Sequence, residues 1–578
     1  MCDGASLTIR RCACSSLDTP GLGLRQYEAV APDSSTSTPQ KLGIELGRLS
    51  WARRLGLDYV HNFDALAPFY AGNPADASAW RAAVDRAQRH PRDRQTLVAL
   101  LTAQQRSRQA PPAALASTAR LADPQAVAIV TGQQAGLFGG PVYTVLKALT
   151  AIKLARRIEA EQHVPVVPVF WIDAEDHDWN EISGCSILDA DLELRTVRMP
   201  GPEGAGERPV ARVRLDDRIT AVIEELRTTF PPTEFTEPLI EQLRGFYAPG
   251  TGMVEAFGRW IDALLGPLGL VVFDCSDPAA KPLVRDIFLR EIETAGRTAT
   301  LALEAGRAME ARGYTAQVEP ADDSVALFHL DGRREAIKRS GDGFVIGDRT
   351  VSASDLAAEA RATPDHFSPN VLLRPLVQDT LFPTVAYVGG PSELGYLGQL
   401  RGVYEHFGLP MPLIYPRATA TVLDSAGTRF LTKYELPLET LQPQDEATLN
   451  RLLESLLPPQ LEASLDRAET VVVESMQAVT AQLTRLDPTL EGAAKSTLGK
   501  MSHELASLRN KLIQAAKRRD ETLRRQFVRA RAQAFPDGQP QERTIGFISL
   551  QDRYGPALVE LLEHALPLDL GVHWVITL

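Results

Sequence analysis

Residues 130–182 read VTGQQAGLFGGPVYTVLKALTAIKLARRIEAEQHVPVVPVFWIDAEDHDWNEI. The apolar run AVAIVT at 126–131 leads into this stretch, and VVPVFWI at 166–172 lies within it. Both runs are short and rich in β-branched residues, which is typical of buried strands. Between them, residues 143–161 carry apolar side chains at helical spacing. This order of strand, turn, helix and strand predicts two parallel strands joined by a helix.

The same pattern recurs farther along the chain. LGLVVF at 268–273, TVAYV at 384–388 and PLIY at 412–415 are further short apolar runs. Together they predict an α/β fold with a doubly wound parallel sheet. About a hundred residues separate the second strand from the third, and about a hundred more separate the third from the fourth, far beyond an ordinary connection. Both intervals predict inserted subdomains, the second with a β-hairpin at 340–343.

Residues 445–535 are almost entirely helix-forming and are interrupted at two proline sites. In the second arm a coiled-coil seam is predicted from apolar residues at alternating spacings of three and four. Its members are Leu498, Met501, Leu505, Leu508, Leu512 and Ala515. We expect this stripe to form a homodimer through the coiled coil. The alternative is a hairpin within one chain, with the Pro459–Leu486 arm covering the same stripe.

At 578 residues the chain exceeds the size of one hydrophobic core. The predicted division follows the elements described above. Its parts are a loosely ordered tail (1–40), N-terminal helices with the first half of the core (41–190), an inserted subdomain (191–265), a core strand and helix (266–295), a second inserted subdomain (296–380), the second half of the core (381–440), a helical coiled coil (441–535) and a C-terminal segment packing on the core (536–578).

Composition excludes several classes of protein. The net charge of −12 disfavours nucleic acid as a partner, because neutralising phosphates requires a basic surface. The sequence contains neither a run of about 18 apolar residues, as a membrane span requires, nor a secretory signal at its N-terminus. Its five cysteines include no C-x-x-C pair, and no paired-histidine spacing is present, so we expect no zinc site and no disulfide framework. A cytoplasmic location fits this composition best.

A glycine-rich turn follows the first predicted strand and precedes a helix. Glycines allow a ligand to approach the backbone closely, and free N–H groups at a helix N-terminus attract anions. We therefore expect ATP or ADP to bind here, with a tight structural turn as the alternative. The candidate cofactor-binding residues are Thr131, Gly132, Gln133, Gln134, Gly136, Gly139, Gly140, Tyr143 and Lys147.

An acidic cluster follows the second predicted strand. Glu175, Asp176, His177 and Asp178 place three carboxylates around one imidazole, an arrangement that favours a general base, an amine-binding pocket or a Mg²⁺ ligand set. The alternative is a helix N-terminus, where acidic residues serve as caps. Because ligands bind at the carboxyl ends of strands in such sheets, we interpret these four residues as catalytic.

A third polar loop follows the strand at 384–388. Its candidate substrate-binding residues are Gly389, Gly390, Ser392, Glu393 and Tyr396. A helix cap with a proline near its first position explains the same pattern. Arg417, after the last short strand, is a candidate for bidentate binding of a carboxylate, although a surface arginine is an equal alternative.

These segments together resemble the bacillithiol-biosynthesis cysteine-adding family, BshC. The resemblance rests on residues 130–182, on DYVHNFDALAPFYAGNPAD at 58–76, on VAYVGGPSELGYLGQLRGVYEHFGLPMPLIYPR at 385–417 and on FPDGQPQER at 535–543. It covers nearly everything after about residue 25. The motifs are long and specific.

The resemblance implies a Rossmann-type core related to class I aminoacyl-tRNA synthetases and pantothenate synthetase. It also implies two connecting-peptide insertions, a coiled coil that dimerises, and amide formation between cysteine and the amine of glucosaminyl-malate. The sequence lacks the HIGH and KMSKS motifs of the synthetases, so adenylation by ATP is expected from the fold alone. Another carboxylate–amine ligase on the same scaffold, or a non-catalytic nucleotide-binding coiled-coil protein, remains open.

Overall fold

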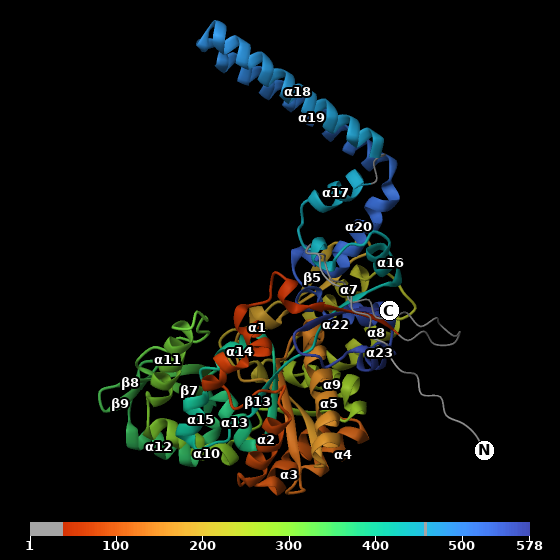
Figure 1. Cartoon of the computed structure of the whole chain (residues 1–578). Helices are drawn as coiled ribbons and strands as arrows, with labels where there is room; N and C mark the ends of the chain where they lie inside the picture. The colour runs from red at the N-terminus through yellow and green to blue at the C-terminus, as the bar shows by residue number, and fades with distance from the viewer. Residues whose placement is uncertain (1–38, 456–458) are drawn as a thin grey trace, which may run out of the picture. The chain divides into compact units, whose positions relative to one another are not determined.

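The computed structural model describes residues 39–455 and 459–578 (Figure 1). Its central sheet has five parallel strands in the order β13-β12-β2-β3-β6. The strands are β2 (Val127–Gln134), β3 (Val166–Asp173), β6 (Val271–Asp274), β12 (Thr384–Gly389) and β13 (Leu413–Pro416). The chain winds outward from β2 in both directions, so the order reverses between β2 and β12. Ligands bind at such a switch point, outside the carboxyl ends of the strands. The predicted doubly wound sheet is confirmed.

Successive residues of β2 face different apolar clusters, which explains why this strand reads as a continuous hydrophobic run. Ile129 packs in one cluster with residues of α2 (Ala77–Arg89) and α5 (Val142–Gln162). Val130, its neighbour, belongs to the largest cluster, which reaches into both inserted regions. Both faces of the sheet are therefore buried, and only its carboxyl edge is left for polar side chains.

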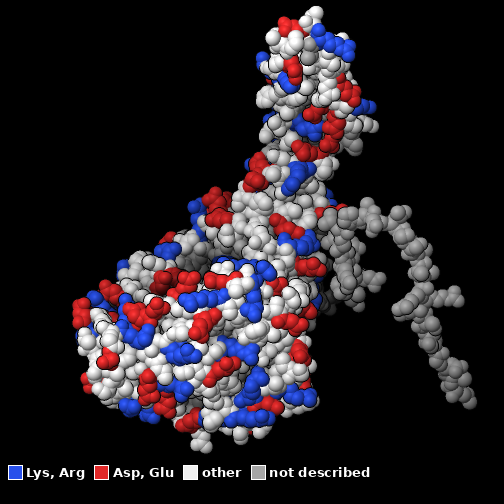
Figure 2. Space-filling view, turned by 60° about the vertical axis from the view of Figure 1, so that its left-hand side comes forward, with Lys and Arg blue, Asp and Glu red and all other residues white. Residues whose placement is uncertain are grey.

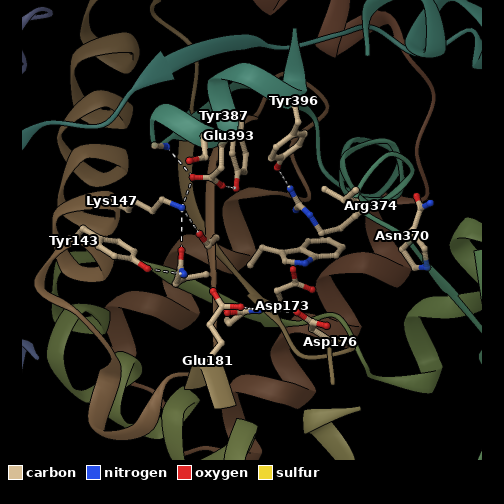
Figure 3. A pocket seen from close by; sticks show the side chains of 18 of the residues that line it. Tyr143, Lys147, Asp173, Asp176, Glu181, Asn370, Arg374, Tyr387, Glu393 and Tyr396 are labelled. Carbon is tan, nitrogen blue, oxygen red and sulfur yellow. Dashed lines mark hydrogen bonds and ion pairs between the residues drawn. The ribbon is translucent and has the colours of Figure 1, made fainter. Parts of the chain in front are cut away.

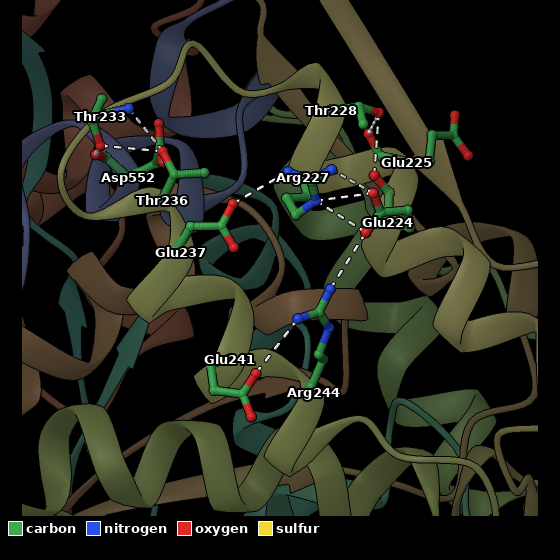
Figure 4. Close-up of polar contacts among 10 residues, drawn as sticks. All are labelled: Glu224, Glu225, Arg227, Thr228, Thr233, Thr236, Glu237, Glu241, Arg244 and Asp552. Atoms are coloured by element: carbon green, nitrogen blue, oxygen red, sulfur yellow. Dashed lines mark hydrogen bonds and ion pairs between the residues drawn. The ribbon is translucent and has the colours of Figure 1, made fainter.

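The interval between β3 and β6 carries a two-stranded antiparallel sheet and three longer helices. These are β4 (Gly184–Leu188), β5 (Leu194–Arg198), α7 (Arg218–Thr229), α8 (Thr236–Phe246) and α9 (Met253–Leu265). Exposed ion pairs link α7 to α8: Arg227 contacts Glu224 and Glu237, and Arg244 contacts Glu224 and Glu241 (Figure 4). Such exposed pairs contribute little stability individually.

The interval between β6 and β12 carries a second sheet, in the order β10-β9-β8-β7-β11. Its strands are β7 (Ser324–Asp331), β8 (Arg333–Ser340), β9 (Gly343–Ile346), β10 (Arg349–Ser352) and β11 (Phe367–Pro369). Ser340 pairs with Gly343, so the predicted hairpin at 340–343 is confirmed. Helix α12 (Ala353–Ala362) and the short helix η8 (Pro364–His366) connect β10 to β11.

A third sheet joins the two ends of the described chain. Strand β1 (Gln40–Glu45) pairs antiparallel with β15 (Val572–Thr577), which pairs in parallel with β14 (Thr419–Leu423). The sequence prediction missed this sheet and treated the region from residue 41 as mostly helical. Of the tail predicted at 1–40, residues 1–38 lie outside the described residues, and Gln40 begins β1.

Helices α18 (Pro459–Leu486) and α19 (Glu491–Arg519) lie side by side (Figure 1). Arg509 of α19 forms an ion pair of 2.5 Å with Asp466 of α18. Helices α18 and α19 therefore form a hairpin within one chain, which was the alternative to the coiled-coil dimer. It leaves Met501 and Leu508 of the predicted seam 40% and 47% exposed.

Acidic and basic side chains are interspersed over the face of the molecule in Figure 2. Among residues 39–455 and 459–578, no helix combines the length and apolar character that a membrane crossing requires.

Candidate active site

A cavity of about 750 Å³ lies at the carboxyl ends of β2, β3 and β12, at the switch point of the sheet (Figure 3). It brings together residues from all three polar loops predicted from the sequence. The predicted residues that line it are Gly132, Gln133, Gln134, Tyr143, Lys147, Asp176, Gly390, Ser392, Glu393, Tyr396 and Arg417.

Lys147 projects from α5 into this cavity wall and is almost fully buried. Its ammonium donates to the carbonyl of Gly132 at 2.9 Å and to Oε1 of Gln133 at 3.1 Å, and it pairs with Glu393 (Figure 3). All three partners belong to the protein, so Lys147 ties the end of β2 to the loop after β12. The phosphate-supporting role predicted for Lys147 would require it to leave these partners.

Glu393 lies in the first turn of α14 (Pro391–Leu397). It accepts hydrogen bonds from the hydroxyl of Tyr387 at 2.6 Å and from the N–H of Gly390 at 2.7 Å. Burial by itself would raise the pKa of Glu393, but Lys147 and these hydrogen bonds outweigh burial and hold that pKa below its usual value. Glu393 is therefore an ionised carboxylate that caps the helix, as the alternative interpretation of this loop stated. Ser392 beside it is exposed.

Asp173 ends β3 and places its carboxylate in the cavity (Figure 3). Within the described part of the chain, no residue donates a hydrogen bond to this carboxylate. Burial raises the pKa of Asp173 above its usual value, and the positive charges of Arg374 and Arg334 oppose that rise. An unpaired carboxylate with a raised pKa in a cavity is a candidate general base.

Two arginines from the second inserted region flank Asp173. Arg374 is buried and donates to the hydroxyl of Tyr396 at 2.9 Å (Figure 3). Arg334 lies with its guanidinium 3.5 Å from Asp176 and stacks over the ring of Phe328 at 3.8 Å. Among the residues that the structure describes, neither guanidinium has a bidentate carboxylate partner, so both remain able to bind an anionic ligand.

The four residues of the acidic cluster after β3 lie in different environments. Asp176 lines the cavity and accepts a hydrogen bond of 2.6 Å from Gln134. Glu175 is buried in an ion pair with Lys281. His177 is half exposed and lies outside the cavity lining. Asp178 accepts from the N–H of Glu181 and caps α6 (Trp179–Ile182). Only Asp176 of the four predicted catalytic residues therefore faces the cavity, and Asp178 has the capping role of the alternative interpretation.

The later glycines of this turn, at positions 136, 139 and 140, pack into the protein instead of facing the cavity. Gly139 has φ +92°, and a Cβ there would lie 2.3 Å from the ring of Trp260. The N–H of Val142, at the start of α5, donates to the carbonyl of Ile545 at 3.0 Å. The N–H of Val142 is therefore not free to bind a phosphate, as the sequence-based argument for this helix N-terminus would require. Gly136, Gly139 and Gly140 lie outside the lining, as does Thr131, which donates to Val388 in the sheet.

Arg417 does bind a carboxylate in bidentate fashion, but the carboxylate belongs to the protein. It donates to both oxygens of Glu542, at 2.9 and 2.6 Å, and both side chains are buried. Its backbone N–H donates to the carbonyl of Gly389, which lies outside the lining. Arg417 therefore supports the cavity wall, and Glu542 occupies the Nη1–Nη2 edge of its guanidinium.

Several lining residues were not predicted as part of the site. Asp173 is the last residue of β3, two positions before the acidic cluster. Its place at the carboxyl end of a strand is the sequence signal that could have identified it as a site residue. Arg334 and Arg374 come from an interval that reads as an insertion, so no local pattern pointed to them. The lining residues that the prediction omitted are Trp171, Asp173, Glu181, Phe328, Arg334, Pro369, Asn370, Val371, Arg374, Tyr387, Pro391 and Arg543.

Comparison with known proteins matches two consecutive regions of the chain to one family. The family description "Bacillithiol biosynthesis BshC, N-terminal Rossmann-like domain" matches residues 44–418, and "Bacillithiol biosynthesis BshC, C-terminal coiled-coil domain" matches residues 420–578. A protein of Salinibacter ruber named "Putative cysteine ligase BshC" is 35% identical over 526 residues, covering 90% of this chain and 96% of its own. Proteins of the same name from Chlorobaculum tepidum (82% and 86% covered) and Koribacter versatilis (90% and 97% covered) are each 33% identical. The chain therefore belongs to the BshC family of bacillithiol biosynthesis.

Proposed function

We propose that this protein is a ligase that joins the carboxyl group of cysteine to the amine of glucosaminyl-malate as an amide. The family to which it belongs and the name "cysteine ligase" carried by its relatives support this reaction. The cavity at the switch point of the sheet is large enough for a small-molecule substrate.

The observation that carries the proposal is the unpaired carboxylate of Asp173 within a cavity flanked by arginines. A sugar amine attacks an acyl group only as the neutral amine, and the adduct must then lose a proton. Asp173 accepts that proton, because its raised pKa makes it a stronger base than an exposed aspartate. Asp176, held by Gln134, is the neighbouring carboxylate that binds the incoming ammonium.

The cationic groups of the cavity fit the anionic parts of these substrates. Arg374 lies deep in the wall, and Arg334 lies beside Asp176. Arg543 lines the cavity with an exposed side chain and has no ion-pair partner among the described residues. We assign the carboxylates of the malate group to these guanidinium groups, which suit planar, bidentate recognition.

ATP or ADP remains part of the proposal. Its phosphates could occupy the guanidinium groups of Arg334, Arg374 and Arg543 only at a stage when the malate group is not bound to them, and the packed glycines at 136, 139 and 140 do not fit phosphates. When bound, ATP would supply the driving force that condensation of a free carboxylate lacks. A Mg²⁺ ion bound there would be held by Asp176, which leaves Asp173 free to accept the proton.

The test is incubation of the purified protein with glucosaminyl-malate, cysteine and ATP, followed by mass spectrometry. Wild type should form the amide, and Asp173→Asn should form it about 10²–10⁴-fold more slowly. Asp178→Asn is the matched control, because it changes a nearby carboxylate that caps a short helix and does not line the cavity. Product from other amino acids but not from cysteine would favour a different carboxylate–amine ligase. Equal rates for Asp173→Asn and wild type would remove Asp173 from the reaction.

A further inference from the structure

Three potential metal ligands meet in the second inserted region, on the sheet that forms one wall of the active-site cavity. His329 lies on β7, Glu359 on α12 and His366 at the end of η8. Their ligand atoms all lie within 4.8 Å of one another. Oε1 of Glu359 is 2.8 Å from Nε2 of His329 and 2.9 Å from Nδ1 of His366. None of these three residues lines the active-site cavity.

We propose that His329, Glu359 and His366 bind a divalent transition-metal ion of the zinc class. Two imidazoles and one carboxylate are a ligand set that zinc uses with a fourth position for water. The exposure of the cluster suits such a site: the side chain of His329 is 2% exposed, whereas those of Glu359 and His366 are 32% and 43% exposed. An ion can therefore enter from the solvent side, while the buried histidine fixes its depth.

The same three side chains also satisfy one another without an ion, because one carboxylate oxygen can accept from both imidazoles. Binding requires a small opening of this arrangement. At metal–ligand distances of about 2.0–2.2 Å, tetrahedral ligand atoms lie about 3.3–3.6 Å apart. Glu359 must therefore retreat by about half an ångström from its hydrogen-bonded position, which its partly exposed place on α12 allows.

The second nitrogen of His329 faces Arg349, whose Nη2 lies 3.4 Å from Nδ1. A metal-bound histidine carries a proton on its free nitrogen and donates it to an acceptor. Arg349 supplies no acceptor and adds a positive charge, so it must turn away when the ion binds. Its side chain is exposed and free to do so. Replacing Arg349 by glutamine should therefore tighten binding, an effect that a purely hydrogen-bonded cluster does not predict.

The site would stiffen the wall of the active-site cavity. His329 pairs in the sheet with Phe367, the residue after His366. Phe328, next to His329, lines the cavity beneath Arg334, and Asn370 just beyond β11 lines it as well. An ion held by β7, α12 and η8 fixes β11 against β7 and so fixes these lining residues. The proposal concerns metal binding alone and stands apart from the proposed ligase reaction.

The experiment uses the full-length protein after chelator treatment and dialysis. Calorimetric titration with Zn²⁺ should give one ion per chain, Co²⁺ should give the visible absorption of a tetrahedral site, and Zn²⁺ should raise the Tm. His366→Ala and Glu359→Gln should each weaken Zn²⁺ affinity by about 100-fold or more, since losing an outer-shell partner alone costs 10–100-fold. Glu359→Gln retains an oxygen that accepts from both histidines, so it separates metal binding from folding.

His564→Ala is the control, because it removes an exposed histidine from another part of the chain. It should bind Zn²⁺ as wild type does, and Arg349→Gln should bind it more tightly. Absence of stoichiometric binding by wild type, or equal affinity in wild type, His366→Ala and Glu359→Gln, would overturn the proposal and leave a hydrogen-bonded cluster with adventitious surface binding only. Circular dichroism of each variant establishes that the compared proteins are folded.

Discussion

Arg417 holds both carboxylate oxygens of Glu542 across 125 positions of sequence, at 2.9 and 2.6 Å. The pair joins the end of the parallel sheet to the C-terminal segment, directly behind the cavity. Burial by itself would raise the pKa of Glu542, but Arg417 outweighs burial and holds it below its usual value. The pair is therefore ionised although it is removed from water.

Glu542→Gln should lower the free energy of unfolding by about 3–5 kcal/mol, because it leaves the charge of Arg417 buried without a counter-charge. Chemical denaturation followed by tryptophan fluorescence measures this. The double variant Arg417→Met/Glu542→Leu should be less destabilised than Glu542→Gln, since it buries no charge. A loss below about 1 kcal/mol in Glu542→Gln would mean that the pair contributes as little as an exposed ion pair.

The rate of amide formation should fall at low pH as Asp173 becomes protonated. A general base acts only when ionised, so activity is lost as the pH drops through its pKa. Because burial raises the pKa of Asp173, this loss should occur at a higher pH than the usual aspartate value of about 3.9. Arg374→Met removes a charge that lowers this pKa, so it should move the acid limb of kcat/KM to still higher pH. An unchanged acid limb in Arg374→Met would assign that limb to another group.

Gly139→Ala should destabilise the protein, because the turn is packed against Trp260. Its positive φ costs about 1–2 kcal/mol with a side chain, and the overlap with Trp260 adds about 1–3 kcal/mol. Thermal unfolding measures the sum. Gly250→Ala is the matched control, because Gly250 has φ +82° but no atom within 4 Å of an added Cβ. Equal Tm losses in the two variants would show that backbone strain alone is responsible.

The ionisation of Asp552 should make the stability of the folded protein fall as the pH rises. Burial raises its pKa to about 6, although the hydroxyl of Thr236 donates to it at 2.7 Å (Figure 4). The folded protein therefore holds this proton more tightly than the unfolded chain, whose pKa is about 3.9. The stability from Asp552 is present below pH 4 and is lost as the pH rises through about 6.

Asp552→Asn, which does not titrate, should gain Tm relative to wild type between pH 4 and pH 7. The comparison of the two proteins at each pH cancels the other titrating groups. A Tm difference that stays constant across this range would contradict the raised pKa.

The homodimer remains a prediction, and the structure sharpens its test. Leu505 is half buried in the hairpin of one chain, so its substitution disturbs that hairpin as well. Met501 and Leu508 are exposed on α19 and are better probes. Leu508→Glu should convert a dimer to a monomer in light scattering. Ala506→Glu, on another face of the helix, should leave it a dimer. A monomeric wild type would contradict the prediction.

The sequence by itself determined the parallel sheet, because β2, β3, β6, β12 and β13 are buried on both faces and read as short apolar runs. It also predicted at which edge of the sheet the candidate site lies. Polar residues that follow such strands must gather at one edge of the sheet, and Gln134, Asp176 and Glu393 do line one cavity. The family resemblance followed from the same segments.

Only the tertiary structure decided which polar residues face that cavity. Glu175 and Asp176 are adjacent in sequence, yet one is paired with Lys281 and the other lines the cavity. Arg417 has the side chain of an anion binder, but the distant Glu542 occupies it. The pairing of β1 with β15, and the meeting of His329 with Glu359 and His366, likewise join residues that no local pattern relates. Sequence periodicity indicates which face of a helix or strand is buried. The partner of a polar side chain, in contrast, depends on contacts between distant segments, because those contacts form only when the chain is folded.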